Sequence, residues 1–256
     1  MSALEQMLRQ GDPDRHAVII AASDSARARL WPLYAFNLEI ARAPYLTQEP
    51  MIAEMRLQFW ADVLDQIASG APVAAHEVAT PLAEIWRAAE LPVALGEQMV
   101  AARRWDIYKK PFGGEQALLD HIQASSGNLM WLAALALGCN AQAEAPVRDM
   151  GLASGLANWL LAVPELQALG RQPLPDLRAG AIAALARHGL DHLARARARR
   201  KHVTPAALPA LLTGWQAGAV LKRAARDPAA VAEGRLRGSE FRKRGSLALR
   251  ALSGRW

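Results

Sequence analysis

The sequence has a single cysteine and no long apolar run, and each shortage excludes a class of protein. Cys139 is the only cysteine among the 256 residues, which excludes an internal disulfide and fits a reducing compartment. The longest apolar stretches, residues 129–138 and 156–163, are far shorter than the ~20 residues of a membrane-spanning helix. The first residues do not follow the basic, apolar, small-residue order of a secretory signal. We therefore expect a cytoplasmic protein.

Runs of β-branched residues are also scarce, whereas Ala, Leu and Arg, which lose little freedom in a helix, are abundant. Apolar residues recur at helical spacing almost throughout, and no segment alternates as a half-buried strand does. The pattern predicts an all-α fold, with a helical domain over residues 1–233 and an irregular or weakly helical basic tail over residues 234–256. The predicted helices, bounded by Pro and Gly, span residues 14–28, 31–43, 51–68, 81–89, 92–105, 114–137, 151–169, 176–200 and 206–226.

Two stretches go beyond generic helical sequence. LYAFNLEIAR at residues 33–42 and MRLQFW at residues 55–60 resemble the entry to the squalene/phytoene synthase family, which reads LYAF and then RL-x-WW. HIQASSGNLM at 121–130, GLASGLAN at 151–158 and GRQPLP at 170–175 are similar to later segments of that family, in the same order. The resemblance implies an isoprenoid-synthase-type helical bundle around a central cavity.

Enzymes of this family join two prenyl diphosphates by ionising an allylic diphosphate. The departing diphosphate is held by Mg²⁺, which prefers carboxylate oxygens as ligands. A helix presents two carboxylates on one face when they lie three or four residues apart. Two facing helices, each with such a pair, would hold the diphosphate between them.

The first of these acidic motifs is missing from the sequence. The resemblance places it just after residues 34–36, in a region that begins at Asn37 and in which the matching positions are Ala41, Arg42 and Tyr45. Glu39 is the only carboxylate nearby, and one carboxylate does not make a pair.

The second acidic motif is missing as well. Asn158 matches the family pattern, but Gly155, Leu161 and Ala162 stand where the family has Gln, Arg and Asp. Glu165 is the only acidic residue close by. We therefore predict no catalytic residue and no bound metal, and Mg²⁺ would be needed only if the protein is nevertheless an enzyme.

The remaining pattern is similar to a divergent, non-catalytic branch of the family, which includes a mitochondrial assembly factor for respiratory complex I (NADH dehydrogenase). The resemblance implies a protein partner, either a subunit of a respiratory complex or an assembly intermediate. Two alternatives stay open. One is a prenyl transferase that uses Glu39 and Glu165 as unconventional ligands. The other is a carrier of an isoprenoid or lipid that performs no chemistry.

Charge is distributed unevenly along the chain. Residues 181–256 hold 16 Lys/Arg against four Asp/Glu, a net charge of +12, whereas residues 1–180 carry −6. A basic segment of this kind favours an anionic partner, although solvated Arg-rich faces would give the same count. No zinc finger, helix-turn-helix or RNA-binding signature is present, so we expect no nucleic-acid partner. We predict contact with an anionic membrane surface, peripheral to the inner membrane, through Arg195, Arg197, Arg199, Arg200 and Lys201.

Overall fold

The computed structural model describes residues 2–256, and these residues form helices and connecting loops without a β-strand. The predicted all-α class is therefore confirmed. The α-helices are α1 (Ala3–Gly11), α2 (Pro13–Ile20), α3 (Asp24–Arg42), α4 (Pro50–Ala68), α5 (Ala79–Ala88), α6 (Val93–Ala102), α7 (Arg104–Tyr108), α8 (Glu115–Ile122), α9 (Asn128–Ala136), α10 (Glu144–Ala168), α11 (Ala179–Ala198), α12 (Leu208–Leu212), α13 (Ala217–Arg226), α14 (Ala229–Ala232) and α15 (Glu240–Ser253).

Short helical turns join several of these helices. One of them, η2, is a π-helical turn that connects α8 to α9 without a break. The turns are η1 (Ala43–Tyr45), η2 (Gln123–Gly127), η3 (Ala141–Ala143), η4 (Arg200–His202) and η5 (Pro205–Ala207).

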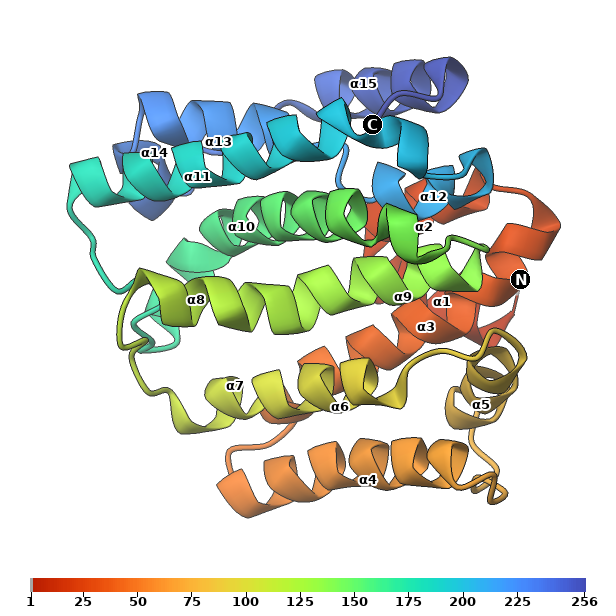
Figure 1. Cartoon of the computed structure of the whole chain (residues 1–256). Helices are drawn as coiled ribbons and strands as arrows, with labels where there is room; N and C mark the ends of the chain where they lie inside the picture. Colours follow the sequence, from red (N-terminus) through yellow and green to blue (C-terminus); the bar gives the residue numbers. More distant parts are fainter. Residues whose placement is uncertain (1) are drawn as a thin grey trace.

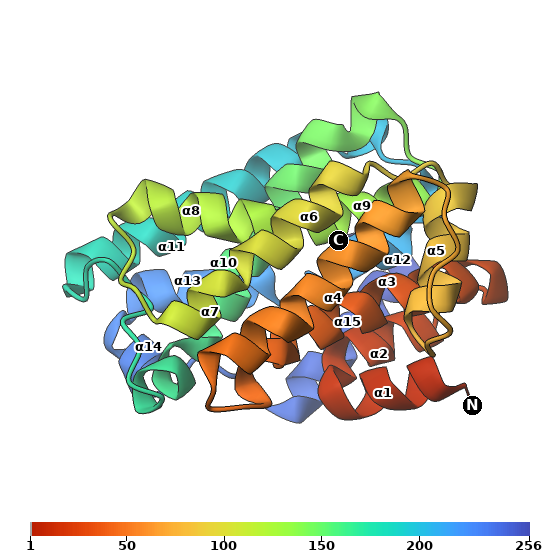
Figure 2. The ribbon, with the colours of Figure 1, turned by 90° about the horizontal axis from the view of Figure 1, so that it is seen from below.

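Helix α10 lies at the centre of the bundle. It contacts α11 and α13 on one side and η2 and α9 on the other, as Figure 1 shows. Helix α4 and the α6–α7 pair lie at the bottom of Figure 1 and face the reader in Figure 2, which looks from below. Residues 150–157 of α10 are all buried. A helix segment that is buried around its whole circumference must lie inside the protein, and this part of α10 accordingly forms the centre of the core.

Two glycines let α10 approach η2 closely. A Cβ atom added at Gly151 would lie 2.8 Å from the Cα of Gly127, and one added at Gly155 would lie 2.4 Å from the Cγ2 of Ile122. Both distances are shorter than a side-chain carbon tolerates. Because glycine has no Cβ, α10 packs directly against the backbone of η2 at Gly151 and against the side chains of Ile122 and Ser126 at Gly155.

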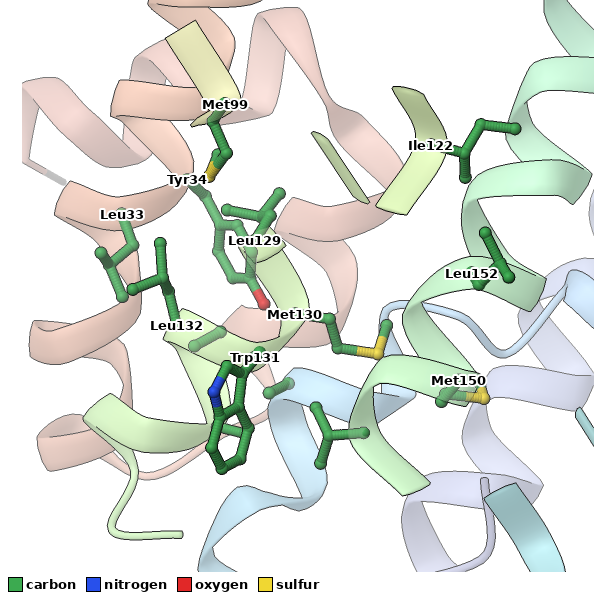
Figure 3. Close-up of a cluster of buried hydrophobic side chains, with 14 of the residues drawn as sticks. Leu33, Tyr34, Met99, Ile122, Leu129, Met130, Trp131, Leu132, Met150 and Leu152 are labelled. Carbon is green, nitrogen blue, oxygen red and sulfur yellow. The ribbon is translucent and has the colours of Figure 1, made fainter. Parts of the chain in front are cut away.

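Side chains fill the interior where a central cavity was expected. Tyr34 of α3, Met130 of α9 and Met150 of α10 are at most 4% exposed, and together with their neighbours they occupy the space between these three helices (Figure 3). Phe36 packs edge-on against Trp60 and Trp86, with ring centroids 5.4 and 6.1 Å apart.

The helix boundaries near the N-terminus differ from the predicted ones. The expected break near Pro32 is wrong, because α3 runs through this residue from Asp24 to Arg42. The break lies instead at Ser23, whose hydroxyl accepts a hydrogen bond from the Ala26 amide at 3.3 Å and caps α3. The proline is a clear sequence signal for a helix start, but here the buried packing of the helix outweighs it.

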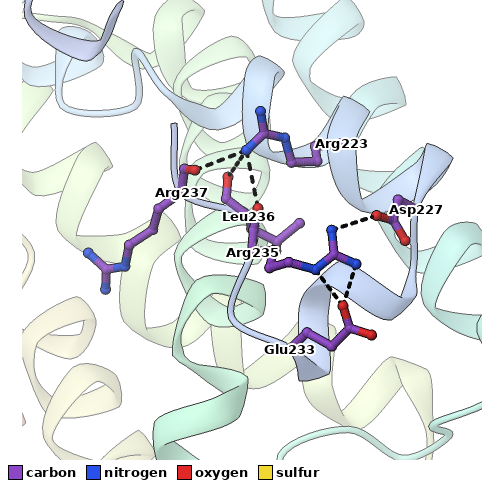
Figure 4. A network of polar contacts seen from close by, with 6 residues as sticks. All are labelled: Arg223, Asp227, Glu233, Arg235, Leu236 and Arg237. Atoms are coloured by element: carbon purple, nitrogen blue, oxygen red, sulfur yellow. Dashed lines mark hydrogen bonds and ion pairs between the residues drawn. The ribbon is translucent and has the colours of Figure 1, made fainter. Parts of the chain in front are cut away.

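The basic tail contains a helix, α15, and is attached to the domain at its start. Arg223 of α13 donates hydrogen bonds from Nη1 to the carbonyl oxygens of Arg235, Leu236 and Arg237, at 3.2, 3.3 and 2.9 Å (Figure 4). Leu236 is only 3% exposed. The predicted domain boundary at residue 234 thus lies inside a bonded segment.

Further along the tail, Lys243 of α15 forms an ion pair with Asp14 of α2. Trp256 is buried, and its backbone oxygen accepts a hydrogen bond from Arg197 Nε at 3.0 Å. Among residues 2–256, no helix combines the length and the hydropathy that a membrane span needs.

Candidate functional site

The residues of the first motif lie along the end of α3 and the turn that follows it. Asn37 is buried at 9% exposure, Ala41 is half-buried and Arg42 is exposed. Glu39 faces α4, where it lines a cavity of about 230 Å³ together with Arg56 and other residues. The Glu39 carboxylate therefore faces the cavity beside α4.

The residues of the second motif lie on α10 and point in several directions. Gly155 is buried against η2, Leu161 and Ala162 are half-buried, and Glu165 is exposed. Asn158 lines a polar cavity of about 180 Å³, which Asp12, Asp14 and Arg15 of the α2 region also line. Glu39 and Asn158 thus open into different cavities, and no contact joins Glu39 with Glu165.

The end of the first motif meets the segment that follows the second motif. Tyr45, the last position of the first motif, lies beside Arg171, whose guanidinium carbon is 5.0 Å from the centre of the tyrosine ring. The Arg171 amide bonds to the carbonyl oxygen of Leu166 at 3.0 Å and so closes the end of α10.

A carboxylate from α7 joins this meeting point. Asp106 Oδ1 accepts a 2.7 Å hydrogen bond from the Tyr45 hydroxyl and lies 3.7 Å from Arg171 Nη1. Asp106 Oδ2 lies 3.7 Å from Arg103 Nη1. Asp106 and Arg171 are only 4% and 6% exposed. We refer to Tyr45, Arg103, Asp106 and Arg171 as the Asp106 cluster.

The Asp106 cluster carries more positive than negative charge. Two guanidinium groups face one carboxylate, and the Nε atoms of Arg103 and Arg171 have no hydrogen-bond acceptor within reach among the described residues. Burial and the neighbouring Asp106 carboxylate raise the pKa of Tyr45 well above its usual value, so this hydroxyl stays protonated and donates. A cavity of about 140 Å³ opens beside the cluster between η1, α7 and the end of α10.

Aromatic side chains form the wall behind the Asp106 cluster. Trp105 stacks on Phe112 with ring centroids 4.8 Å apart, and the His121 ring lies 5.1 Å from Trp159 and 5.8 Å from Trp105. Burial, with a smaller contribution from the positive charge of Arg103, lowers the pKa of His121 to about 4. His121 is therefore neutral at physiological pH.

The residues at the motif positions do not fit a magnesium ion. Ala41, Ala162 and Leu166 have no side-chain oxygen, and Asp106 is already engaged by two guanidinium groups and a hydroxyl. Within residues 2–256, no group of three or more His, Cys, Asp or Glu side chains could hold a metal ion. That the protein needs no cofactor stays a prediction.

The structure divides the predicted basic surface into two parts. Arg195 lies 3.3 Å from Asp149, and Arg197 bonds to Trp256, so both are engaged within the protein. Arg199, Arg200 and Lys201 are exposed at the end of α11.

The sequence did not predict that the residues of the Asp106 cluster lie together. Tyr45 and Asp106 are 61 residues apart, and no local pattern links positions so distant. The available signals were the acidic residue within a basic stretch, at Asp106, and the arginine of the GRQPLP segment, at Arg171.

Comparison with known proteins places the chain in a family. The model of the squalene/phytoene synthase family matches residues 8–178, and the chain therefore belongs to the squalene/phytoene synthase family. A solved dehydrosqualene synthase in complex with ligand superposes with a TM-score of 0.82 at 15% identity, over 98% of this chain and 94% of that one. The squalene synthase HpnC from Alicyclobacillus acidocaldarius superposes with a TM-score of 0.75 at 16% identity, over 88% and 92%. The predicted isoprenoid-synthase-type fold is confirmed.

Curated relatives carry a different description. The chain is similar to NADH dehydrogenase (ubiquinone) complex I, assembly factor 6, from Bos taurus, at 26% identity over 62% of this chain and 48% of that protein. The human protein of the same name is 25% identical over the same shares. The chain thus matches about half the length of these relatives.

Substituting Gly155 should test the close approach of α10 to η2. We expect Gly155→Ala to lower the free energy of unfolding by about 1–3 kcal/mol, because the new methyl group overlaps Ile122 and Ser126. Gly180→Ala, in α11, is the matched control, since no heavy atom lies within 4 Å of its added Cβ. Urea unfolding measures both. Equal stability of the two variants would contradict the packing argument.

Removing the carboxylate of the Asp106 cluster should destabilise the protein strongly. Asp106→Ala leaves two arginines without their counter-charge, and loss of one partner of a buried pair costs about 3–5 kcal/mol. Asp176→Ala removes the partner of an exposed arginine, Arg178, and should leave the unfolding midpoint nearly unchanged. Thermal and urea unfolding of the two variants provide the comparison. A small effect at Asp106 would mean that the arginines do not depend on it.

Acidification should weaken the fold through His121. An unfolded histidine binds a proton below about pH 6.5, whereas the buried one stays neutral down to about pH 4. Its contribution to stability is therefore complete above pH 6.5 and is lost as the pH falls toward 4, by up to about 3 kcal/mol. His121→Phe should remove this part of the pH dependence in urea unfolding. An unchanged slope in the variant would refute the assignment.

Proposed function

We propose that this protein is a non-catalytic member of the squalene/phytoene synthase family that assists the assembly of respiratory complex I at a membrane surface. The observation that carries the proposal is the Asp106 cluster. Beside Tyr45, a position of the first motif, this chain has two arginines and a single engaged aspartate, and no carboxylate pair is present at the motif positions themselves. The names of the curated relatives supply the partner complex.

Electrostatics argues against prenyl transfer at this place. A Mg²⁺ ion brought to the cluster would meet two guanidinium groups in a site of low exposure, where like charges repel strongly. The two carboxylates that remain near the motifs, Glu39 and Glu165, do not converge on a common point. Metal ions stabilise the departing diphosphate in such chemistry, and this electrostatic contribution is usually the largest single one.

The packed interior also gives the carrier alternative little support. An isoprenoid chain would need an apolar cavity between the helices, yet Tyr34, Met130 and Met150 lie buried there. Protein interiors are close-packed, so only minor rearrangements are open to a buried core of this kind. A protein partner needs no such cavity, because it binds to the surface.

A deletion experiment tests the proposal. Removing the gene from its host should reduce the amount of assembled complex I and the NADH dehydrogenase activity of the membranes, and a tagged copy should recover complex I subunits. Complementation with Glu39→Gln/Glu165→Gln should restore the activity as fully as the wild type does. These substitutions remove the only motif-region carboxylates but leave the Asp106 cluster intact.

Two results would overturn the proposal. One is normal complex I in the deletion strain, together with a tagged copy that recovers no subunit. The other is Mg²⁺-dependent binding of a non-hydrolysable farnesyl diphosphate analogue. If a chelator abolished this binding, the result would indicate that the protein is an enzyme.

A further inference from the structure

The outward face of α15 is apolar although no part of the described chain covers it. Phe241 and Leu252 are each 88% exposed and Leu249 is 69% exposed. Phe241 and Leu252 are about three helical turns apart and project in nearly the same direction, and Leu249 follows within about 80° of Phe241 around the helix. Gly245 and Ala248 lie between them on the same face.

The opposite face of α15 holds the helix to the protein. Lys243 is ion-paired with Asp14, which also accepts a 2.8 Å hydrogen bond from Gln216 Nε2. Leu247 and Ala251 pack against the core. The helix therefore has a fixed orientation at the outer edge of the bundle (Figure 1), and its apolar face is directed away from the body.

Cations flank this apolar face on both sides. Arg242 and Arg244 are exposed, and at 100° per residue they project to either side of the stripe that Phe241 and Leu252 form. The helix has one acidic residue, Glu240, which lies 3.4 Å from Lys243. The bond between Arg197 and Trp256 brings the exposed basic end of α11 close to the same region.

We infer that α15 is a membrane-docking helix, whose apolar face inserts into the interfacial layer of an anionic lipid bilayer. A short helix with an apolar face and basic edges lies in the plane of such a surface, with its apolar side chains below the headgroups. The arginines beside it add attraction to the anionic headgroups. This inference rests on the membrane location proposed above, and it identifies α15 as the surface that would bind the membrane.

The charge pattern favours a bilayer over a second copy of the chain. Two copies that met through this face would bring the basic edges of both helices into one interface, with no acidic residue on the outer face to offset the arginines. Three large side chains on a helix of 14 residues also bury far less than the roughly 800 Å² per partner of a stable protein interface.

Vesicle binding tests the inference with the purified full chain. Association with phosphatidylcholine vesicles containing phosphatidylglycerol should exceed that with pure phosphatidylcholine, and should weaken as salt is added. Phe241→Ser/Leu252→Ser should reduce the association constant about tenfold or more. Arg242→Gln/Arg244→Gln should reduce it about fivefold per arginine. Thermal unfolding verifies that each variant is folded, as expected for exposed positions.

The matched control is Met51→Ser/Met55→Ser on α4, where the two side chains are 76% and 66% exposed. The two methionines lie one helical turn apart, and this double variant removes a similar exposed apolar area. It should leave vesicle binding unchanged. Wild-type protein that does not bind anionic vesicles would overturn the inference, as would equal losses in the two serine variants. A dimer that forms through α15 in sedimentation velocity, and that Phe241→Ser/Leu252→Ser abolishes, would overturn it too. None of these outcomes depends on complex I, so the deletion experiment is judged separately.

Discussion

The direct contact between α10 and η2 is the constraint around which the bundle is arranged. Gly151 brings α10 against the backbone of η2, and Gly155 lets it contact the side chains of Ile122 and Ser126. Helices α8, α9, α11 and α13 pack on the elements so joined. Gly155 stands at the position where the family carries a glutamine, and a glutamine here would have no room in this packing.

At the C-terminal end of α10, buried charges hold three elements together. Arg171 and Arg103 supply two positive charges, Asp106 offsets one of them, and the Tyr45 hydroxyl donates to the same carboxylate. The resulting polar cluster ties η1, α7 and the segment after α10 together.

Much of the helical framework could be predicted from the sequence, because helical periodicity and helix-ending residues are local signals. The burial of Trp60 and Trp86 follows from the same pattern. The start of α3 could not be predicted, since the capping hydroxyl of Ser23 is a weaker sequence signal than Pro32. The Asp106 cluster depends on positions that only the tertiary fold brings together. The docked orientation of α15 depends on the packing of Leu247 and Ala251 and on the ion pair of Lys243 with Asp14, a long-range contact that leaves no trace in local sequence.

The attachment before α15 has a consequence for how freely this part of the sequence can vary. Arg223 bonds to three successive backbone carbonyls, and every amino acid has a carbonyl group. Side chains at residues 235–237 can therefore be exchanged without removing an acceptor, whereas the donor is a single guanidinium that no other side chain reproduces. In related sequences, the arginine on α13 is thus the position to follow, because these three hydrogen bonds place no requirement on the side chains of the segment; Leu236 is constrained separately, by its burial.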